Sequence, residues 1–306
     1  MSPRTQSRML SPHRPSRLTP TLIAWLSVGL VVLVIAILVV VKISSGGGQT
    51  TSSHQAVLPA SPPLVREVST VPATVFNAVG VGIPSQFTGD IPIVIGGQPP
   101  LTLHGKTPTM MYYGAEYCPY CAAERWGIAV ALARFGSWHG LDTTASGLLD
   151  GDYSTLSFRR AKLVSSFINV VPIETCTNIV DPGASGCNGY RPLQSPTPAE
   201  QAALSRYASP AFVPDNTEGI SFPFIDVDNR VLFSGSTYQP ALLTGLTQSE
   251  IARGLTDPTN PVTQAVVGTA NYLSAAVCAG THGAPTTVCT SPGVRAADAA
   301  LRLSDG

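Results

Sequence analysis

Apolar residues along this chain fall into short runs and periodic stretches that predict its strands and helices. Residues 110–113 form an apolar, aromatic run that ends in small residues, which is typical of a buried strand. Beyond Cys118, four apolar residues recur at helical spacing before Gly136, namely Ile128, Ala131, Leu132 and Phe135. A helix is therefore predicted to begin at Pro119, since proline at the first helical position gives up no intrahelical hydrogen bond.

Later segments carry equally local signals. Residues 167–173 predict a second buried strand. Residues 197–200 and 247–250 each form a capping box, which predicts the start of a helix, and the first of these helices is expected to reach about Tyr207. Pro261 opens the last long helix. The pattern predicts a domain in which helices and strands are mixed.

Shorter strands are predicted on both sides of these elements. Residues 91–95 favour an edge strand, because Pro92 cannot donate a hydrogen bond to a sheet. Residues 101–103 predict a short second strand after a proline-rich turn. Residues 223–227 and 230–233 predict a late hairpin that has a proline at its head.

One apolar segment is long enough to cross a membrane. Residues 22–41 are apolar apart from Ser27 and Gly29, and at about 1.5 Å per residue they span a hydrocarbon core of about 30 Å. Arginines precede this run and the first acidic residue is Glu67, so the positive-inside rule places the N-terminus in the cytoplasm. A cleaved signal peptide is the alternative, but the run is too long and no Ala-x-Ala site follows it. We expect a single-pass anchor in the cell membrane.

Composition on either side of the anchor predicts the domain limits. Residues 1–21 form a basic cytoplasmic tail, and residues 42–85, rich in small residues and proline at their start, form a flexible linker and lead-in. Residues 86–290 are expected to form one extracytoplasmic domain. Residues 291–306 are expected to form a polar C-terminal tail of uncertain order.

Charge and motif content exclude several classes of function. The formal net charge is zero and 12% of residues are charged, against about 25% in an average protein, so no surface for nucleic acid is predicted. Gly80 and Gly82 lack the third glycine of a dinucleotide fingerprint. A Cys-x-x-Cys pair can bind Cu(I) or Zn but needs further ligands, and the five histidines are scattered, with only His139 following the first helix. We predict no metal site and no cofactor.

Six cysteines fall into three pairs. Two residues lie between Cys118 and Cys121, whereas the pairs Cys176 and Cys187, and Cys278 and Cys289, share one longer spacing. The simplest partition is two structural disulfides, Cys176–Cys187 and Cys278–Cys289, and one reactive pair, although a bond between Cys121 and Cys176 is an open alternative that would end the redox hypothesis. Structural disulfides persist in an oxidising compartment, which agrees with export.

The Cys118–Cys121 pair has the arrangement of a dithiol redox site. Cys118 is expected at the N-terminus of a helix, where the helix dipole and free N–H groups favour its thiolate. Cys121 then lies one turn inside the helix, close enough to attack a mixed disulfide on Cys118. A lone Cys-x-x-Cys is a weak signal, but one between a strand and a helix is a good one.

Residues 115–121, Ala-Glu-Tyr-Cys-Pro-Tyr-Cys, resemble the active-site turn of the thioredoxin superfamily, and Cys-Pro-Tyr-Cys is the form familiar in glutaredoxins. The resemblance implies an α/β fold, an α+β sandwich in which helices flank a central mixed sheet, here with an insertion at about 137–215. It also implies that Pro223 is a cis-proline; a trans bond in an edge strand is the alternative. Residues 219–226 are similar to those of an uncharacterised, membrane-anchored prokaryotic thioredoxin-like family of unknown function.

The resemblance implies a thiol–disulfide oxidoreductase with Cys118 as the exposed, low-pKa nucleophile and Cys121 as the resolving thiol. The backbone at Phe222, beside Pro223, would pair with an extended substrate, and Tyr117 and Tyr120 would line the groove. The expected partners are exported cysteine-containing proteins and a redox partner in the membrane. The buried acid of thioredoxins has no identified counterpart: Glu116 is expected in the exposed turn, where it would be solvated rather than catalytic.

The alternative function is a redox-silent binding module of the cell envelope. In that case Cys118–Cys121 would be a permanent structural disulfide, because a fold does not by itself imply an activity. The direction of a redox reaction also stays open, since it depends on a reduction potential that the two residues between the cysteines do not set alone.

Overall fold

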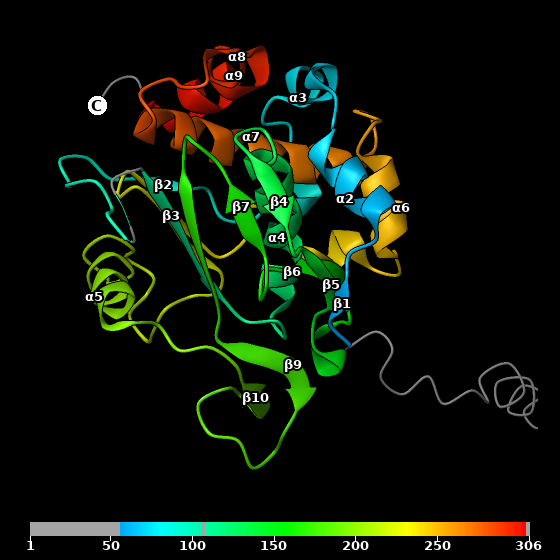
Figure 1. The fold of residues 1–306 in the computed structure, drawn as a ribbon, viewed down its shortest axis with the longest axis vertical. Helices are drawn as coiled ribbons and strands as arrows, with labels where there is room; N and C mark the ends of the chain where they lie inside the picture. Colours follow the sequence, from blue (N-terminus) through cyan, green and yellow to red (C-terminus); the bar gives the residue numbers. More distant parts are fainter. Residues whose placement is uncertain (1–55, 104, 106–107, 304–306) are drawn as a thin grey trace, which may run out of the picture. The chain divides into compact units, whose positions relative to one another are not determined.

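A computed structural model describes residues 56–103, 105 and 108–303 of the 306-residue chain (Figure 1). The predicted cytoplasmic tail, the anchor at residues 22–41 and the first part of the linker lie outside these residues. None of the helices in the described part is long and apolar enough to cross a membrane.

A mixed sheet of five strands forms the centre of the described part of the chain. In spatial order the strands are β2 (Ile93–Val94), β12 (Val231–Ser234), β11 (Phe224–Val227), β3 (Thr109–Gly114) and β8 (Asn169–Glu174). The β3–β8 pair is parallel, and the other pairs are antiparallel. A parallel pair needs a crossover connection, which α4 (Pro119–Leu132) begins.

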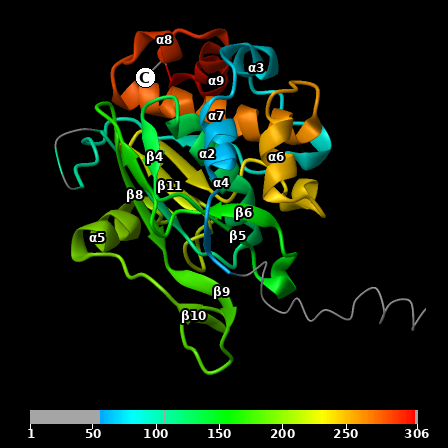
Figure 2. The same cartoon turned by 45° about the vertical axis from the view of Figure 1, so that its right-hand side comes forward.

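Alternation along β3 explains why helices cover both faces of this sheet. Met110 and Tyr112 face the larger core, to which α4 and α7 (Pro261–Gly280) contribute, whereas Met111 faces a smaller core that includes residues of α5 (Pro198–Tyr207). The two views show α5 on the opposite side of the sheet from α7 (Figure 1, Figure 2). The sheet is thus buried on both faces.

Helices α4 and α7 pack closely because Gly127 has no side chain. A Cβ placed at Gly127 would lie 2.7 Å from the Cβ of Thr269 on α7. The remaining helices are α2 (Pro62–Ser69), α3 (Ala73–Val79), α6 (Gln248–Gly254), α8 (Thr286–Cys289) and α9 (Pro292–Leu301).

Most of the smaller strands belong to the segment expected as an insertion. They are β4 (Ser137–His139) with β7 (Lys162–Val164), β5 (Asp142–Ala145) with β6 (Ser154–Ser157), and β9 (Cys176–Val180) with β10 (Tyr190–Pro192); β1 (Leu58–Pro59) joins β5 from the N-terminal side. Three short 3₁₀ helices, η1 (Ser85–Phe87), η2 (Leu148–Asp150) and η3 (Pro240–Leu243), complete the elements of the described residues. The β9–β10 hairpin projects from the rest of the domain in both views (Figure 1, Figure 2).

Several sequence predictions are confirmed. The strand at 110–113, the helix start at Pro119 and the late hairpin are present, and both capping boxes form with Thr197 and Thr247 as N-caps. The Phe222–Pro223 peptide bond is cis. Both expected structural disulfides, Cys176–Cys187 and Cys278–Cys289, are present, with Cα–Cα distances of 5.9 and 5.6 Å.

Other predictions are wrong. Part of the expected flexible linker is helix α2, because Ser61 caps it and Leu64 and Val68 bury one face. The expected C-terminal tail contains helix α9, whose buried residues Val294, Ala297 and Leu301 recur at helical spacing.

The remaining differences are local. Residues 101–103 do not form a strand, although Leu101 and Leu103 are buried, and β2 is shorter than the predicted strand and excludes Pro92. Helix α4 ends at Leu132, before Gly136.

Candidate functional site

Cys118 occupies the N-cap position of helix α4. Pro119 is the first helical residue, and the Sγ of Cys118 accepts a hydrogen bond from the backbone N–H of Cys121 at 3.3 Å. The sulfur therefore takes the place of the oxygen that usually caps a helix, and it lies where free N–H groups and the helix dipole favour negative charge.

The surroundings of Cys118 lower the pKa of its thiol. The largest cause is the hydrogen bond from the Cys121 thiol; burial opposes it, and the Cys121 N–H and the charge of Arg125 add to the lowering. Cys118 is only 5% exposed, so the expectation of an exposed nucleophile is wrong. It shares a buried cluster with Tyr117, Tyr190 and the Cys176–Cys187 disulfide.

Cys121 has the opposite electrostatic character. It is fully buried, and burial raises the pKa of its thiol well above the usual value, with the hydrogen bond to Cys118 and the charge of Cys118 adding to the rise. Gly114 leaves room for this thiol, since a Cβ there would lie 2.9 Å from the Cys121 Sγ and closer still to the Tyr112 hydroxyl. The pKa values of the two thiols are thus shifted in opposite directions.

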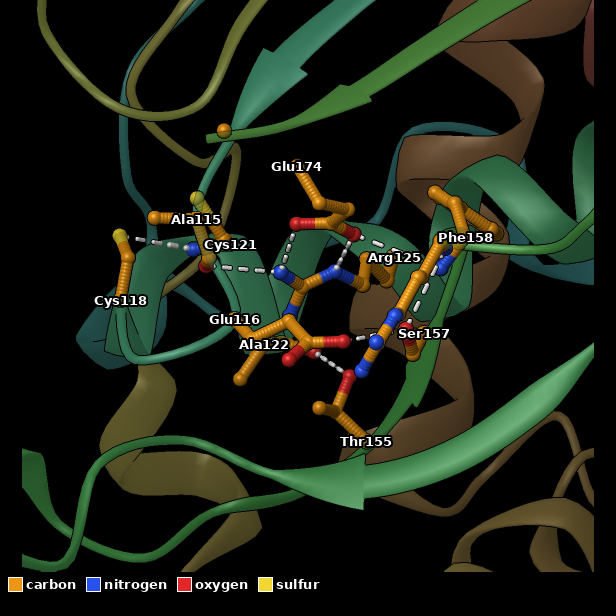
Figure 3. A network of polar contacts seen from close by, with 12 residues as sticks. Ala115, Glu116, Cys118, Cys121, Ala122, Arg125, Thr155, Ser157, Phe158 and Glu174 are labelled. Carbon is orange, nitrogen blue, oxygen red and sulfur yellow. Dashed lines mark hydrogen bonds and ion pairs between the residues drawn. The ribbon is translucent and has the colours of Figure 1, made fainter. Parts of the chain in front are cut away.

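A fully buried ion pair lies one helical turn beyond Cys121 (Figure 3). The guanidinium of Arg125 donates from Nε to Glu174 Oε1 at 2.9 Å and from Nη2 to Glu174 Oε2 at 2.7 Å. Nη2 also donates to the carbonyl of Ala115 at 2.7 Å, which ties α4 to the turn before Cys118. Burial alone would lower the pKa of Arg125, but the Glu174 carboxylate raises it above its usual value, so the site holds a permanent positive charge.

Glu116 is fully buried, so the expectation that it is solvated is wrong. Its Oε1 accepts a hydrogen bond from the Ser157 hydroxyl at 2.8 Å, and its Oε2 has no partner among the described residues. Burial, with the charge of Glu174 adding to it, raises the pKa of this carboxyl. Glu116 lies two residues before Cys118, and Figure 3 shows it on the side of Arg125 away from Glu174.

Arg125 and Glu174 are not among the site residues predicted from the sequence. Arg125 stands four residues after Cys121, so it was bound to share a helix face with that cysteine. Glu174 is the last residue of β8, the strand that pairs in parallel with β3. The strand predicted at residues 167–173 stops one residue before it. The available signals were the helical spacing of Arg125 from Cys121 and a charged residue directly after the apolar run of β8.

The expected substrate-binding residues divide into two groups. Phe222 and Tyr117 lie against Cys118: the Phe222 carbonyl oxygen is 3.9 Å from the Cys118 Sγ, and Pro223 follows it in buried surroundings. Tyr117 is almost buried and stacks on Tyr190. Tyr120 is 44% exposed and stands outside this cluster.

Within the described residues, no group of three or more His, Cys, Asp and Glu side chains is arranged to hold a metal ion. His139 is exposed on β4. Cys118 and Cys121 form no disulfide and stand together as two thiols.

Comparison with known families gives one match. Residues 98–171 match a domain of unknown function, DUF929, so this segment, from before β3 into β8, is similar to that uncharacterised family. The match contains Cys118, Cys121, Arg125 and Glu116, and it ends before Glu174. No curated protein and no solved structure matches the chain.

Proposed function

We propose that this protein is a membrane-anchored, extracytoplasmic thiol–disulfide oxidoreductase that acts on cysteines of exported proteins. The observation that carries the proposal is the opposite shift of the two thiols: the pKa of Cys118 is lowered at a helix N-terminus, and that of buried Cys121 is raised. A permanent structural disulfide does not require thiols of different pKa, whereas a dithiol mechanism requires one nucleophile and one resolving thiol.

The order of elements supports a thioredoxin-like fold. A strand (β3), the Cys-x-x-Cys helix (α4), a parallel strand (β8), a helix (α5), a hairpin headed by a cis-proline (β11 and β12) and a last long helix (α7) follow one another. The pairs β4–β7, β5–β6 and β9–β10 are then additions to this order.

The reaction begins when the Cys118 thiolate attacks one sulfur of a substrate disulfide. A Cys118–substrate disulfide forms, the substrate S–S bond breaks and the second substrate sulfur leaves as a thiolate. Cys121 then loses its proton and attacks the Cys118 Sγ, so that a Cys118–Cys121 disulfide forms and the first substrate sulfur is released. The substrate is reduced by two electrons and the protein is oxidised; the reverse sequence oxidises a substrate dithiol.

The buried charges assist both halves of this reaction. The positive charge of Arg125 favours the thiolate of Cys118 and, to a lesser degree than burial opposes it, that of Cys121. Glu116 has a raised pKa and an oxygen without a partner among the described residues, so it is the side chain best suited to exchange a proton near this site. We assign it the role of the buried acid that the sequence did not reveal.

Trapping of mixed disulfides tests the proposal on the full-length chain. Cys121→Ser is expected to accumulate covalent complexes with exported cysteine-containing proteins, because the second attack is blocked. Cys118→Ser is the matched control and is expected to accumulate none. Equal trapping by both variants, or by neither, would contradict the proposed division of roles.

The reduction potential of the Cys118–Cys121 pair decides the direction of the reaction. Thiol trapping in glutathione buffers should give a value of about −270 to −120 mV for a working oxidoreductase, with reductants at the lower end and oxidants at the upper end. A value below about −300 mV would indicate a structural bridge, and the binding-module function would replace the enzyme.

A further inference from the structure

A pocket of about 300 Å³ lies beside the thiol site, between η2 and the β9–β10 hairpin. Its lining includes Tyr117, Leu149, Asp150, Val180, Asn188 and Tyr190. Tyr117 directly precedes Cys118, so the pocket begins next to the nucleophile. The side chains from Val180 onward lie beyond the segment that resembles DUF929.

The floor of this pocket is held in place by polar contacts. The rings of Tyr117 and Tyr190 stack with centroids 4.5 Å apart. The Asn188 amide donates to the Tyr117 hydroxyl at 2.9 Å, and the Tyr190 hydroxyl donates to Asp150. Both hydroxyls are engaged within the protein, and the two tyrosines, which are 9% and 5% exposed, form the floor of the pocket.

The rim of the pocket is apolar and accessible. Leu149 is 83% exposed and Val180 is 46% exposed, and the neighbouring Leu148 and Ile179 are also exposed. Large apolar side chains that gather on an exposed surface mark a site of interaction. A pocket of this volume accommodates one large side chain rather than a whole folded domain.

The pocket shares Tyr117 and Tyr190 with the buried cluster that contains Cys118. Cys118, Tyr117, Tyr190 and the Cys176–Cys187 disulfide belong to one buried cluster, and this disulfide joins the first residue of β9 to the loop before β10. A polypeptide whose cysteine reaches Cys118 therefore passes the pocket within a few residues. The hairpin is held at a fixed place beside the reaction.

Charge narrows the chemistry of the ligand. Among the described residues that line the pocket, Asp150 is the charged one and no lysine, arginine or histidine is present. A carboxylate brought into this pocket would face Asp150 without a compensating cation. The site is complementary to an apolar side chain and repels an acidic one.

We propose that this pocket, made by η2 and the β9–β10 hairpin, selects substrate polypeptides that carry a large apolar side chain within a few residues of the reacting cysteine. The inference rests on the proposed oxidoreductase function and names the substrate class of that site. The ligand is an extended segment of an unfolded exported protein, since such a segment exposes both its cysteine and its apolar side chains.

Peptide kinetics test this selectivity on the reduced full-length protein. Each peptide carries one cysteine in a mixed disulfide with thionitrobenzoate, and leucine or aspartate is placed in turn at each position within three residues of that cysteine. At one or more positions, leucine is expected to give a kcat/KM about tenfold above aspartate, the usual discrimination of an apolar pocket. Equal rates at every position would overturn the proposal.

Variants assign the selectivity to the pocket. Leu149→Asp and Val180→Asp are expected to reduce the rate with the leucine peptide about tenfold, while the rate with 2-hydroxyethyl disulfide, which has no side chain to bind, stays unchanged. Ile91→Asp changes another apolar residue, 69% exposed, that does not line the pocket, and it should alter neither rate. A loss of both rates in the pocket variants would contradict a role in selectivity.

A binding measurement separates this inference from the proposed function. A fluorescent leucine peptide in which serine replaces the cysteine cannot react, so its anisotropy with the full-length chain reports the pocket alone. Binding that is weakened by Leu149→Asp supports the pocket even if no disulfide exchange occurs. Binding that the variant does not change would overturn it.

Discussion

Glu124 and Arg125 are consecutive, fully buried residues of helix α4. Arg125 keeps its charge in an ion pair, whereas Glu124 has a raised pKa that favours its neutral form. Arg125 turns toward the cysteine side of the helix, where the Glu174 carboxylate and the Ala115 carbonyl accept hydrogen bonds from its Nε and Nη2. Glu124 turns toward Thr237, which donates to its Oε2 from the backbone at 2.9 Å and from the hydroxyl at 3.1 Å. The side of α4 that faces the cysteines therefore holds a full positive charge, whereas the side that faces Thr237 holds a carboxyl that can be neutral.

The difference teaches how one helix separates two electrostatic environments. Burial raises the pKa of Glu124 to about 7, with the charge of Asp90 adding to the rise, so the carboxyl is largely protonated in mildly acid solution. The ion pair keeps Arg125 charged at all accessible pH values. Permanent charge is thus confined to the side of α4 that faces the thiols.

Breaking the ion pair should have the largest effect on stability. Glu174→Gln leaves the Arg125 charge buried without a counter-charge, and we expect the free energy of unfolding to fall by about 3–5 kcal/mol. Urea unfolding of the full-length chain measures this loss. The double variant Arg125→Met with Glu174→Leu removes both charges and should recover most of it, and a double variant no more stable than the single one would contradict the charge argument.

Removing the acid on the other side should change how stability depends on pH. The folded-state pKa of Glu124, about 7, exceeds the unfolded value near 4.5, so the folded state binds more protons between these values and stability falls as pH rises through them. The loss in the free energy of unfolding that comes from ionising Glu124 is complete above pH 7 and amounts to about 3 kcal/mol. Glu124→Gln should remove it, so that the stability difference between variant and wild type grows from pH 4 to pH 8.

Asp226 is a second source of pH-dependent stability over the same range. Burial also raises the pKa of its carboxyl to about 7, so it contributes its own fall in stability over the same pH range. Comparing Glu124→Gln with the wild type isolates the Glu124 contribution because Asp226 is present in both. A difference that does not vary with pH would show that the pKa of Glu124 is the same in the folded and unfolded states.

Two glycine substitutions distinguish the sides of α4 by reactivity. Gly114→Ala brings a Cβ against the Cys121 Sγ, and Gly127→Ala brings one against Thr269. Each is expected to cost about 1–3 kcal/mol of stability through overpacking. Only Gly114→Ala should also change the rate at which Cys118 is alkylated by iodoacetamide; an equal change in both variants would mean that the thiols respond to general loosening.

The smallest expected effect concerns the pKa of Cys118 alone. Cys121→Ala removes the hydrogen bond that does most to lower that pKa, whereas Cys121→Ser retains a donor. We expect the pH profile of Cys118 alkylation to move to higher pH in Cys121→Ala and to move less in Cys121→Ser. Glu124→Gln should leave the pH profile of Cys118 alkylation unchanged. A shift in this variant would show that Glu124 and Cys118 are electrostatically coupled, contrary to the separation of the two sides of α4.

Local signals in the sequence were sufficient for the elements that carry the thiols. The apolar run of β3, the proline at the first position of α4 and the two capping boxes act within a few residues, so their outcome does not depend on distant parts of the chain. The two structural disulfides agree with the simplest partition of the cysteines, although the spacing alone left a Cys121–Cys176 bond open.

The charged part of the site could not be predicted in the same way. Charged residues are usually exposed, and the contacts of buried Glu116 and Arg125 come from β6 and β8, which lie later in the chain. Helices α2 and α9 were missed for a related reason: each is short, and its apolar face has meaning only once α4, α6 or α7 lies against it.

The ion pair also sets an order of events during synthesis. Glu174 follows Arg125 by 49 residues, and at 5–20 residues per second the chain needs roughly 2–10 s to reach it. Until β8 pairs with β3, the Arg125 side chain has no carboxylate partner, so it stays hydrated and free to change conformation. A nascent chain therefore has no fixed positive charge beside the two cysteines until the crossover closes.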